Sequence, residues 1–560
     1  MAESCAADYA IFRLNGTLAS GTFPVPLYRE VFFVFDTIIR GGAVLDGTGA
    51  PAFFADIAVK DGRIAAVAPH ITAVAAREID AAGRTVTPGF LDIHRHGDLA
   101  VFRPGFGELE LRQGLTTIVN GNCGMSAAPF GPAHRAGILE YLSPVIGTGS
   151  VPTESVAAYC SAVRKLALPI HVGLLAGSGV IRADVAGFAA GELDRDQLRA
   201  VHAGMERALG EGALGVSLGL GYAPDCFYDT QGLIEALAPL AGTDVPLCVH
   251  MRDEGSNVER SVEEMLTVAK ALGCPVELSH LKAIGRENWG SRIPRVLARL
   301  ARARAEGVRV SWDVYPYTAG STQLLHILPP EILEGGTEAL CKKLLDPDCR
   351  AYIRTRLQTG SDYNNISQLV GWENILLSTL NRPEHQPLLG KSLAEVSALL
   401  GQAPDLCAMD LLAAERCTIT MIDFITAEED IAAILRSEGA SVISDATYPT
   451  AGRPHPRLYG NFARLIEKYV FQDGVLTLPE AIHKMTGAPA AALGLAGKGV
   501  IAPGMDADLN IFDPREVQES GTYLEPAVFA RGIDTVLVSG EVALANGSLT
   551  GCCGGRVLTR

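Results

Sequence analysis

The chain has 560 residues, of which 48% are hydrophobic and 20% charged, and it contains 60 glycines. This composition is typical of a globular enzyme that alternates helices and strands, and it excludes a disordered chain. The formal net charge of −16 argues against a nucleic-acid partner, because phosphate binding depends on clustered lysine and arginine.

Residues 1–34 show no clear hydrophobic period, and we expect a loosely attached N-terminal extension. They lack the basic start and the continuous apolar stretch of a signal peptide. Residues 31–35, the most apolar early segment, are far too few to span a membrane. The 12 cysteines are scattered along the chain, which is typical of reduced core thiols. We therefore expect a cytoplasmic protein with no membrane partner.

Short strands separated by glycine turns are expected in residues 35–86, where Asp46-Gly47 and Asp61-Gly62 mark two of the turns. The same pattern returns in residues 504–513 and 535–544. We expect residues 35–86 and 496–560 to form one small β-sandwich together.

Between these two regions, eight apolar runs of strand length are separated by helical stretches. They are residues 87–96, 116–123, 169–177, 213–222, 246–252, 275–282, 308–317 and 440–447. Alternation of this kind predicts an α/β fold, a (β/α)8 TIM-type barrel over residues 87–495, whose strands all end at one catalytic mouth. The interval 322–427 between strands seven and eight is too long for a loop, so we expect an insertion that covers this mouth. The alternative is a peripheral subdomain that mediates subunit contacts.

His94 and His96 end the first of these runs. A strand of period two points both imidazoles to the same face, which predicts a metal site. Two solvated loop histidines are the alternative. The buried context of the preceding run and the candidate ligands on later strands favour the metal site.

Further candidate ligands end other predicted strands: Cys123, His250, His280 and Asp445. A thiolate combined with imidazoles suits Zn²⁺. His94 and His96 with Asp445 are expected either to hold a second ion or to shape the water site. Asp445 is expected to accept a proton from an activated water and to pass it to the leaving amine, although an N-cap role is the alternative.

Lys282 lies two residues beyond His280, on the same face if the strand continues. Its ammonium is then expected at the mouth, where it can pair with a substrate carboxylate. Arg457 is the next candidate for this role.

Several motifs resemble the D-aminoacylase, or N-acyl-D-amino-acid deacylase, branch of the amidohydrolase superfamily from about residue 35 to the C-terminus. They start at Pro88 (Pro-Gly-Phe-Leu-Asp-Ile-His-Arg-His), Asn120 (Asn-Gly-Asn-Cys-Gly), Gly212, His250 (His-Met-Arg-Asp-Glu-Gly), Ser279 (Ser-His-Leu-Lys), Asn288 (Asn-Trp-Gly), Asp313, His455, Met485 (Met-Thr) and Gly499. The resemblance implies zinc-dependent hydrolysis of N-acyl-D-amino acids by activated water.

The resemblance also implies roles for single residues. Cys123, His250 and His280 match the ligands of a tightly bound zinc. His94, His96 and Asp445 match a second, weaker metal position, and Asp445 matches the general acid/base. The residues that match substrate-binding positions are Lys282, Tyr315, Ser321, Tyr222 and Arg457.

The main alternative is a cyclic-amide hydrolase such as a dihydroorotase or hydantoinase. Those enzymes typically bridge two metals with a carboxylated lysine on the fourth strand, and residues 213–222 contain no lysine. A catalytically inactive barrel that serves as a binding scaffold is a second alternative. The segment after Asp445 differs in detail from acidic-substrate enzymes, so the preferred side chain stays open, as do the acyl group and the oligomeric state.

Overall fold

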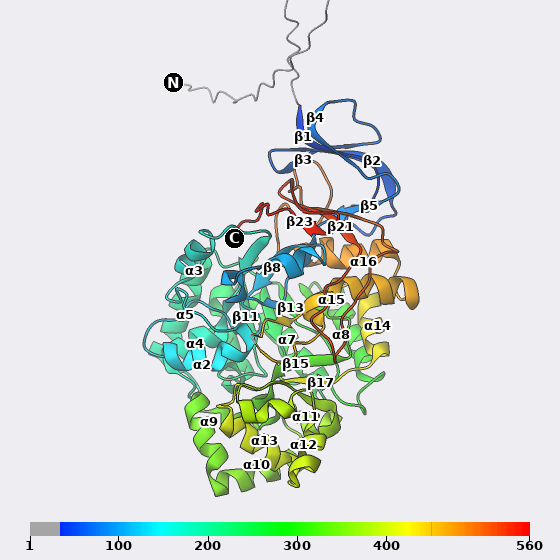
Figure 1. The fold of residues 1–560 in the computed structure, drawn as a ribbon. Helices are drawn as coiled ribbons and strands as arrows, with labels where there is room; N and C mark the ends of the chain where they lie inside the picture. The colour runs from blue at the N-terminus through cyan, green and yellow to red at the C-terminus, as the bar shows by residue number, and fades with distance from the viewer. Residues whose placement is uncertain (1–33, 450) are drawn as a thin grey trace, which may run out of the picture.

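The computed structural model describes residues 34–449 and 451–560. The expected N-terminal extension lies outside the described residues except for Val34. Three layers follow one another in Figure 1: a terminal β-sheet at the top, the barrel in the middle and a helical insertion at the bottom.

All eight predicted barrel strands are present and pair in parallel. In order they are β6 (Phe90–Asp92) with β7 (Arg95–His96), β8 (Leu115–Asn120), β9 (His171–Leu174) with β10 (Ala176–Gly177), β11 (Val216–Gly219), β12 (Leu247–His250), β13 (Val276–Leu278), β14 (Val310–Val314), and β18 (Ala440–Val442) with β19 (Ala446–Thr447).

Closure of the barrel occurs between its last and first strands. β19 pairs in parallel with β7, and the backbone N–H of Asp445 donates to the carbonyl oxygen of His94 at 2.9 Å. The predicted TIM-type barrel is therefore confirmed, and its closing contact joins two of the candidate site residues.

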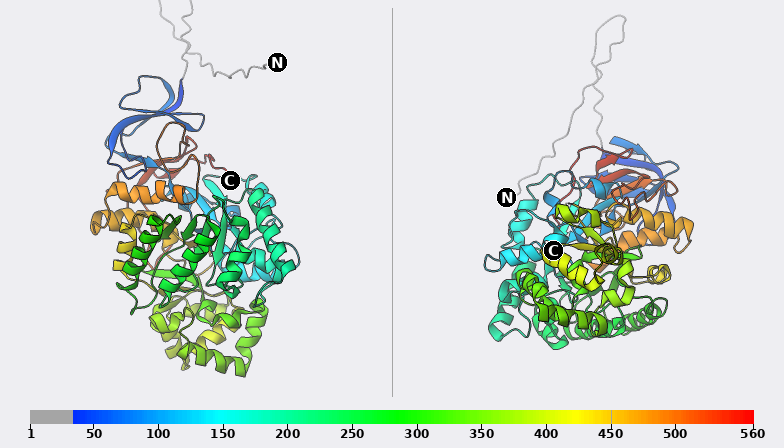
Figure 2. Two further views of the ribbon diagram at one scale, coloured as in Figure 1. Left: turned by 180° about the vertical axis from the view of Figure 1, so that it is seen from behind. Right: turned by 60° about the horizontal axis from the view of Figure 1, so that its bottom comes forward.

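Helices cover the outside of the barrel (Figure 2). They are α1 (Glu108–Leu111), α2 (Arg135–Ile146), α3 (Val156–Val163), α4 (Ser178–Ala186), α5 (Arg195–Gly210), α6 (Thr230–Ala236), α7 (Val258–Leu272), α8 (Arg292–Ala305), α14 (Glu428–Arg436), α15 (Arg457–Arg464), α16 (Leu478–Met485) and α17 (Gly487–Ala492), with a π-helical segment at Leu465–Gln472. In α7, Val258, Val262, Met265 and Leu266 are buried at helical spacing, so one face packs on the barrel. None of the described helices is both long and apolar enough to span a membrane.

Both chain ends contribute to the terminal sheet, as the sequence predicts. Its order is β23-β22-β21-β20-β5-β1-β2-β3, with β4 paired to β1. The strands are β1 (Phe35–Val44), β2 (Phe53–Lys60), β3 (Arg63–Ala68), β4 (Ala75–Asp80), β5 (Thr85–Pro88), β20 (Leu509–Phe512), β21 (Ile533–Val538), β22 (Glu541–Ala545) and β23 (Ser548–Leu549). The domain boundaries at residues 34, 86 and 495 stay a prediction.

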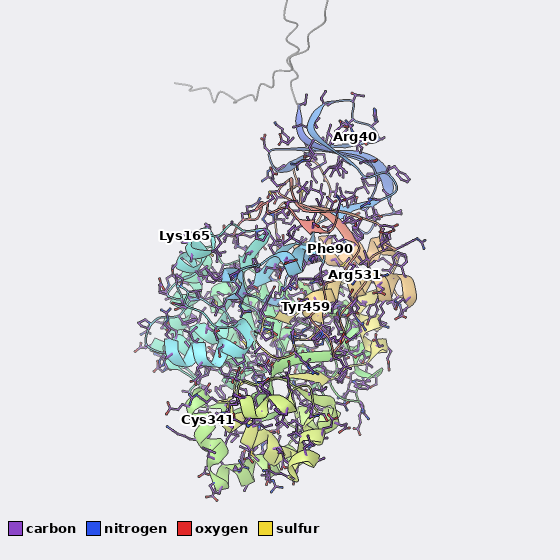
Figure 3. All side chains as sticks on the ribbon, in the orientation of Figure 1. Arg40, Phe90, Lys165, Cys341, Tyr459 and Arg531 are labelled. Carbon is purple, nitrogen blue, oxygen red and sulfur yellow. The ribbon has the colours of Figure 1, made fainter. Side chains whose placement is uncertain are left out.

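The insertion between β14 and β18 forms its own small layer. β15 (Ala319–Gln323) and β16 (Ile375–Thr379) flank β17 (Thr420–Phe424) in an antiparallel sheet. The helices of this layer are α9 (Gly336–Leu345), α10 (Pro347–Thr359), α11 (Ile366–Val370), α12 (Leu393–Leu400) and α13 (Pro404–Ala414). Cys341 in this layer lies at the opposite end of the molecule from Arg40 in the terminal sheet (Figure 3). The insertion therefore covers the barrel end remote from the terminal sheet.

A buried ion cluster joins the terminal sheet to the barrel. Lys498 Nζ lies 3.0 Å from Asp506 Oδ2 and also contacts Asp508. Asp508 in turn lies 3.0 Å from His171 Nε2 on β9. Because these groups are buried, each charge depends on its partner for compensation.

We predict that Lys498→Ala lowers the free energy of unfolding by about 3 kcal/mol, because it leaves buried carboxylates without their shared cation. Urea denaturation monitored by circular dichroism measures the change. The matched control is Lys342→Ala, which removes an exposed lysine paired with exposed Glu338 and should leave the midpoint unchanged. Equal midpoints for both variants would show that the buried cluster adds no stability.

Candidate metal centre

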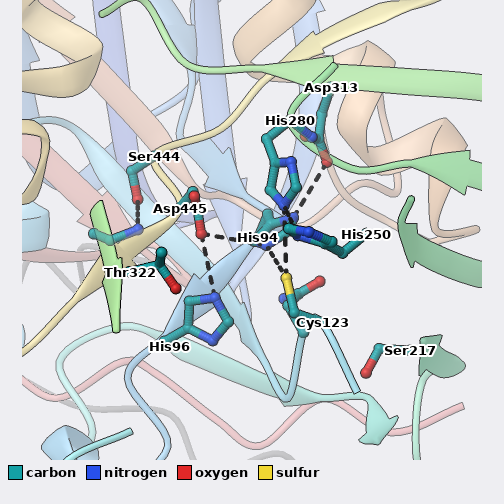
Figure 4. Close-up of polar contacts among 12 residues, drawn as sticks. His94, His96, Cys123, Ser217, His250, His280, Asp313, Thr322, Ser444 and Asp445 are labelled. Atoms are coloured by element: carbon teal, nitrogen blue, oxygen red, sulfur yellow. Dashed lines mark hydrogen bonds and ion pairs between the residues drawn. The ribbon is translucent and has the colours of Figure 1, made fainter. Parts of the chain in front are cut away.

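The carboxyl ends of the barrel strands bring a thiol and imidazoles together (Figure 4). Cys123 Sγ lies 3.3 Å from His94 Nε2 and 3.7 Å from His280 Nε2. All three side chains are buried. These distances place one sulfur and two nitrogens around a common point, so the three residues can contact a single ion.

His250 extends this cluster from the neighbouring strand β12. Its Nδ1 lies 2.9 Å from His280 Nε2, the same nitrogen that faces Cys123. The predicted tight-site residues Cys123, His250 and His280 therefore adjoin one another, with His94 beside them.

His96 and Asp445 form the other half of the site. Asp445 Oδ1 lies 3.2 Å from His96 Nε2 and 3.5 Å from His94 Nε2. Asp445 Oδ2 lies 3.0 Å from Arg457 Nη1. Asp445 thus links the two histidines predicted for the second metal position to a buried arginine.

Three of these residues adopt left-handed backbone conformations. Cys123, His280 and Asp445 have φ values of 55°, 37° and 51°. Residues other than glycine rarely take such values, and where they do the surrounding structure holds them. The turn that follows each strand is what aims these side chains at the common point.

The electrostatic environment favours ionised ligands. Burial by itself raises the pKa of the Cys123 thiol, but the charge of His94 and hydrogen bonds from His250 and His280 outweigh it and lower the pKa well below the usual range. Burial likewise raises the pKa of Asp445, and Arg457 with the His96 hydrogen bond lowers it well below normal. A thiolate and a carboxylate are therefore favoured in this buried site.

Two acidic residues that were not among the predicted site residues support the ligands. Glu254 Oε1 lies 3.0 Å from His280 Nδ1, and Lys282 Nζ donates to the same oxygen at 2.9 Å. Asp313 Oδ2 lies 3.6 Å from His94 Nδ1, and Asp313 also accepts from the His280 backbone N–H. Carboxylates on the far nitrogens of metal-binding histidines fix the orientation of the rings. Both residues belong to motifs given in the sequence analysis. An acidic residue close in sequence to a predicted ligand could have identified them as partners of that ligand.

A cavity of about 210 Å³ opens next to the cluster. Of the residues predicted to bind substrate, Tyr222, Lys282, Tyr315 and Ser321 line it, together with His250, His280 and Asp445. Arg457 stands behind this wall, where its Nη2 donates to the carbonyl oxygen of Ser321 at 3.1 Å. Residues of the insertion form much of the remaining lining, so the insertion borders the mouth, and its role as a cover stays a prediction.

The donor set fits a zinc ion. His280 Nε2 lies close to both His250 Nδ1 and Cys123 Sγ. Lone pairs that face one another in a buried site need a cation or shared protons to compensate them. Mixed sulfur and nitrogen ligands are those that Zn²⁺ accepts. Groups of potential ligand atoms within 4.8 Å of one another are His94 with Cys123 and His280, His94 with His96 and Asp445, and His250 with Glu254 and His280.

Known proteins are similar to this chain in sequence and in fold. The profile of the amidohydrolase family matches residues 77–544. D-aminoacylase from Alcaligenes xylosoxydans xylosoxydans is 32% identical over 527 residues, which cover 94% of this chain and 98% of that protein. N-acyl-D-glutamate deacylase from the same organism is 35% identical over 510 residues, which cover 90% and 93%.

A solved structure of N-acyl-D-glutamate deacylase from Bordetella bronchiseptica, complexed with zinc and a phosphonate inhibitor, superposes with a TM-score of 0.78 at 32% identity. The match covers 94% of this chain and 100% of that one.

We predict that Cys123→Ala retains less than about half an equivalent of zinc after dialysis, against about one for the wild type, because one of three strong ligands is lost. Elemental analysis measures the metal. Cys248→Ala is the matched control, since Cys248 is an equally buried cysteine on β12 outside the clustered ligands, and it should keep its zinc. Full zinc content in Cys123→Ala would remove Cys123 from the ligand set.

Proposed function

The chain belongs to the amidohydrolase family, and from this membership and the site geometry we propose that it is a zinc-dependent enzyme that hydrolyses N-acyl-D-amino acids to a carboxylate and a free D-amino acid. The observation that carries the proposal is that two groups of potential ligands, Cys123 with His280 and His96 with Asp445, share His94. His280, Asp445 and Lys282 line the adjoining cavity. One tightly bound zinc and a second, weaker position fit the two halves of the site.

Zinc, when bound, supplies a Lewis acid that polarises the acyl carbonyl and makes water more acidic. We assign its tight binding to Cys123, His250 and His280, and the weaker position to His94, His96 and Asp445. Glu254 holds the His280 ring so that Nε2 faces the cluster.

Asp445 acts as the general acid/base in this proposal. Arg457 and His96 keep its carboxylate ionised, so it accepts the proton of the attacking water and returns it to the departing amine. Arg457 also fixes the orientation of this carboxylate through the contact with Oδ2, which leaves Oδ1 toward the histidines. Water is the nucleophile, and no covalent acyl-enzyme forms.

Lys282 is assigned to the substrate α-carboxylate. Its side chain lines the cavity, and its ammonium donates to the backbone carbonyl oxygen of His280. The positive charge therefore lies next to the proposed metal ligands. In the structure Lys282 donates to Glu254. Tyr222, Tyr315 and Ser321 complete the wall around the scissile amide. The Tyr222 ring centroid lies 4.3 Å from that of His250, and the two rings are tilted by 44°.

The cyclic-amide alternative is not supported, because β11 reads Val-Ser-Leu-Gly and offers no lysine to bridge two metals. An inactive scaffold is also a poor explanation, since buried thiolate, imidazoles and carboxylate would then be kept at an energetic cost without a ligand. We further propose a cytoplasmic location, which the free state of all described cysteines supports.

A panel of matched N-acetyl-D- and N-acetyl-L-amino acids tests the proposed function. We expect amine release from D substrates and at least about 100-fold lower kcat/KM for their L counterparts, because anchoring the carboxylate and the carbonyl leaves one side of the α-carbon facing a wall. Equal rates for both enantiomers, or release from cyclic amides alone, would contradict the proposal.

We predict that Asp445→Asn keeps its tightly bound zinc but loses at least about 10²-fold in kcat, because asparagine preserves size but cannot accept and return a proton. Steady-state kinetics and elemental analysis on the same preparation separate chemistry from metal loss. Asp98→Asn is the matched control, since Asp98 is another buried aspartate close in space to His96 that accepts from backbone N–H groups. Near wild-type kcat in Asp445→Asn would make Asp445 a structural residue.

A further inference from the structure

The insertion contributes both apolar and polar side chains to the cavity wall. The apolar ones are Leu328, Pro330, Leu333, Tyr363, Ile366 and Ile425, and the polar ones include Thr322, Asp362 and Asn364. His326 also lines this wall, and burial, with a smaller effect of His250, lowers its pKa to about 3. This histidine is therefore neutral near neutral pH, and none of the described lysines or arginines lies on the part of the cavity wall that the insertion contributes.

One buried carboxylate lies in this part of the wall. Asp423 lies on β17, lines the cavity and is 2% exposed, and its Oδ1 has no hydrogen-bond partner among the described residues. Its partner in the β15–β17 register is Gly320. A Cβ at Gly320 would lie 3.1 Å from Asp423 Oδ1 and 3.2 Å from Tyr315 Oη. The missing side chain at Gly320 thus leaves space for the carboxylate beside Tyr315.

The cations around the cavity are already paired. Among the lysines and arginines described, Lys282 and Arg252 line it. Lys282 donates to Glu254, and Arg252 contacts Glu264 at 3.0 Å and donates to two backbone carbonyls.

Arg457, behind the wall, is paired with Asp445. A substrate α-carboxylate that takes Lys282 therefore leaves no unpaired lysine or arginine at the cavity, among the residues that the structure describes, for a second carboxylate.

We propose that this pocket selects N-acyl-D-amino acids with neutral, mainly apolar side chains and rejects acidic ones, with Asp423 as the specificity-determining residue. The inference rests on the proposed function and names its substrate class. An acidic side chain would meet the buried Asp423 carboxylate, and such a like-charge contact strongly disfavours binding. Burial raises the pKa of Asp423 to about 6, an effect that Lys282 and Arg457 oppose, so the carboxylate is ionised at mildly alkaline pH.

The wild-type enzyme provides the first arm of the test, with N-acetyl-D-leucine, N-acetyl-D-glutamine and N-acetyl-D-glutamate as substrates. Glutamine and glutamate have nearly the same shape and differ in charge. We expect kcat/KM to be highest for leucine and at least about tenfold lower for glutamate than for glutamine.

Asp423→Asn provides the second arm, because it removes the charge and keeps the size of the side chain. The glutamine-to-glutamate ratio of kcat/KM should fall about tenfold. The matched control is Asp362→Asn at the same cavity, where the aspartate is largely exposed and paired with Arg356 at 2.9 Å, and the ratio should not change.

Calorimetric binding supplies a readout independent of turnover. Zinc-loaded Asp445→Asn should bind N-acetyl-D-glutamine at least about tenfold more tightly than N-acetyl-D-glutamate, and addition of Asp423→Asn should remove the difference.

The possible results separate the two proposals. Hydrolysis of D substrates with N-acetyl-D-glutamate equal to or better than N-acetyl-D-glutamine would overturn the assigned specificity and leave the proposed function standing. A folded Asp423→Asn variant with an unchanged ratio would do the same. Failure to hydrolyse any N-acetyl-D-amino acid would overturn both proposals.

Discussion

Burial of several ionisable groups at one end of the barrel is the constraint on which the rest of the site depends. Cys123, His94 and His280 are no more than 3% exposed, and their polar atoms face one another and not water. Such a group is costly unless a cation or shared protons compensate it. The eight strands enforce this proximity because their carboxyl ends meet at one mouth.

Two charged residues beside the proposed ligands, Glu254 and Arg457, connect metal binding to substrate binding. Glu254 contacts the far nitrogen of His280 and also holds Lys282, so one carboxylate orients a proposed metal ligand and positions the proposed anchor. Arg457 does the same for the other half of the site, where it holds Asp445 and the backbone of Ser321. Lys282 and Arg457 are both paired with carboxylates of the protein itself, so neither is free to bind a second negative charge on the substrate.

The sequence predicted the barrel strands and the clustering of Cys123, His280 and Asp445 at their ends because two local rules apply: apolar runs of strand length form the barrel, and the carboxyl ends of its strands meet at one mouth. Glu254 escaped these rules, since it lies four residues beyond His250 in a turn where strand alternation no longer holds. Asp423 is positioned by the pairing of its strand with Gly320, about 100 residues away in the chain, and with Ile375, and no local pattern encodes these pairings. The left-handed backbones of Cys123 and Asp445 are likewise set by tertiary packing.

The most direct test of the account is X-ray absorption spectroscopy at the zinc edge on the purified, zinc-loaded protein. Coordination by Cys123 and histidines predicts one sulfur at about 2.3 Å together with nitrogen or oxygen ligands at about 2.0–2.2 Å. Imidazole multiple scattering should accompany them. A first coordination sphere of nitrogen and oxygen without sulfur would contradict the assignment of the buried thiolate as the ligand around which this site is built.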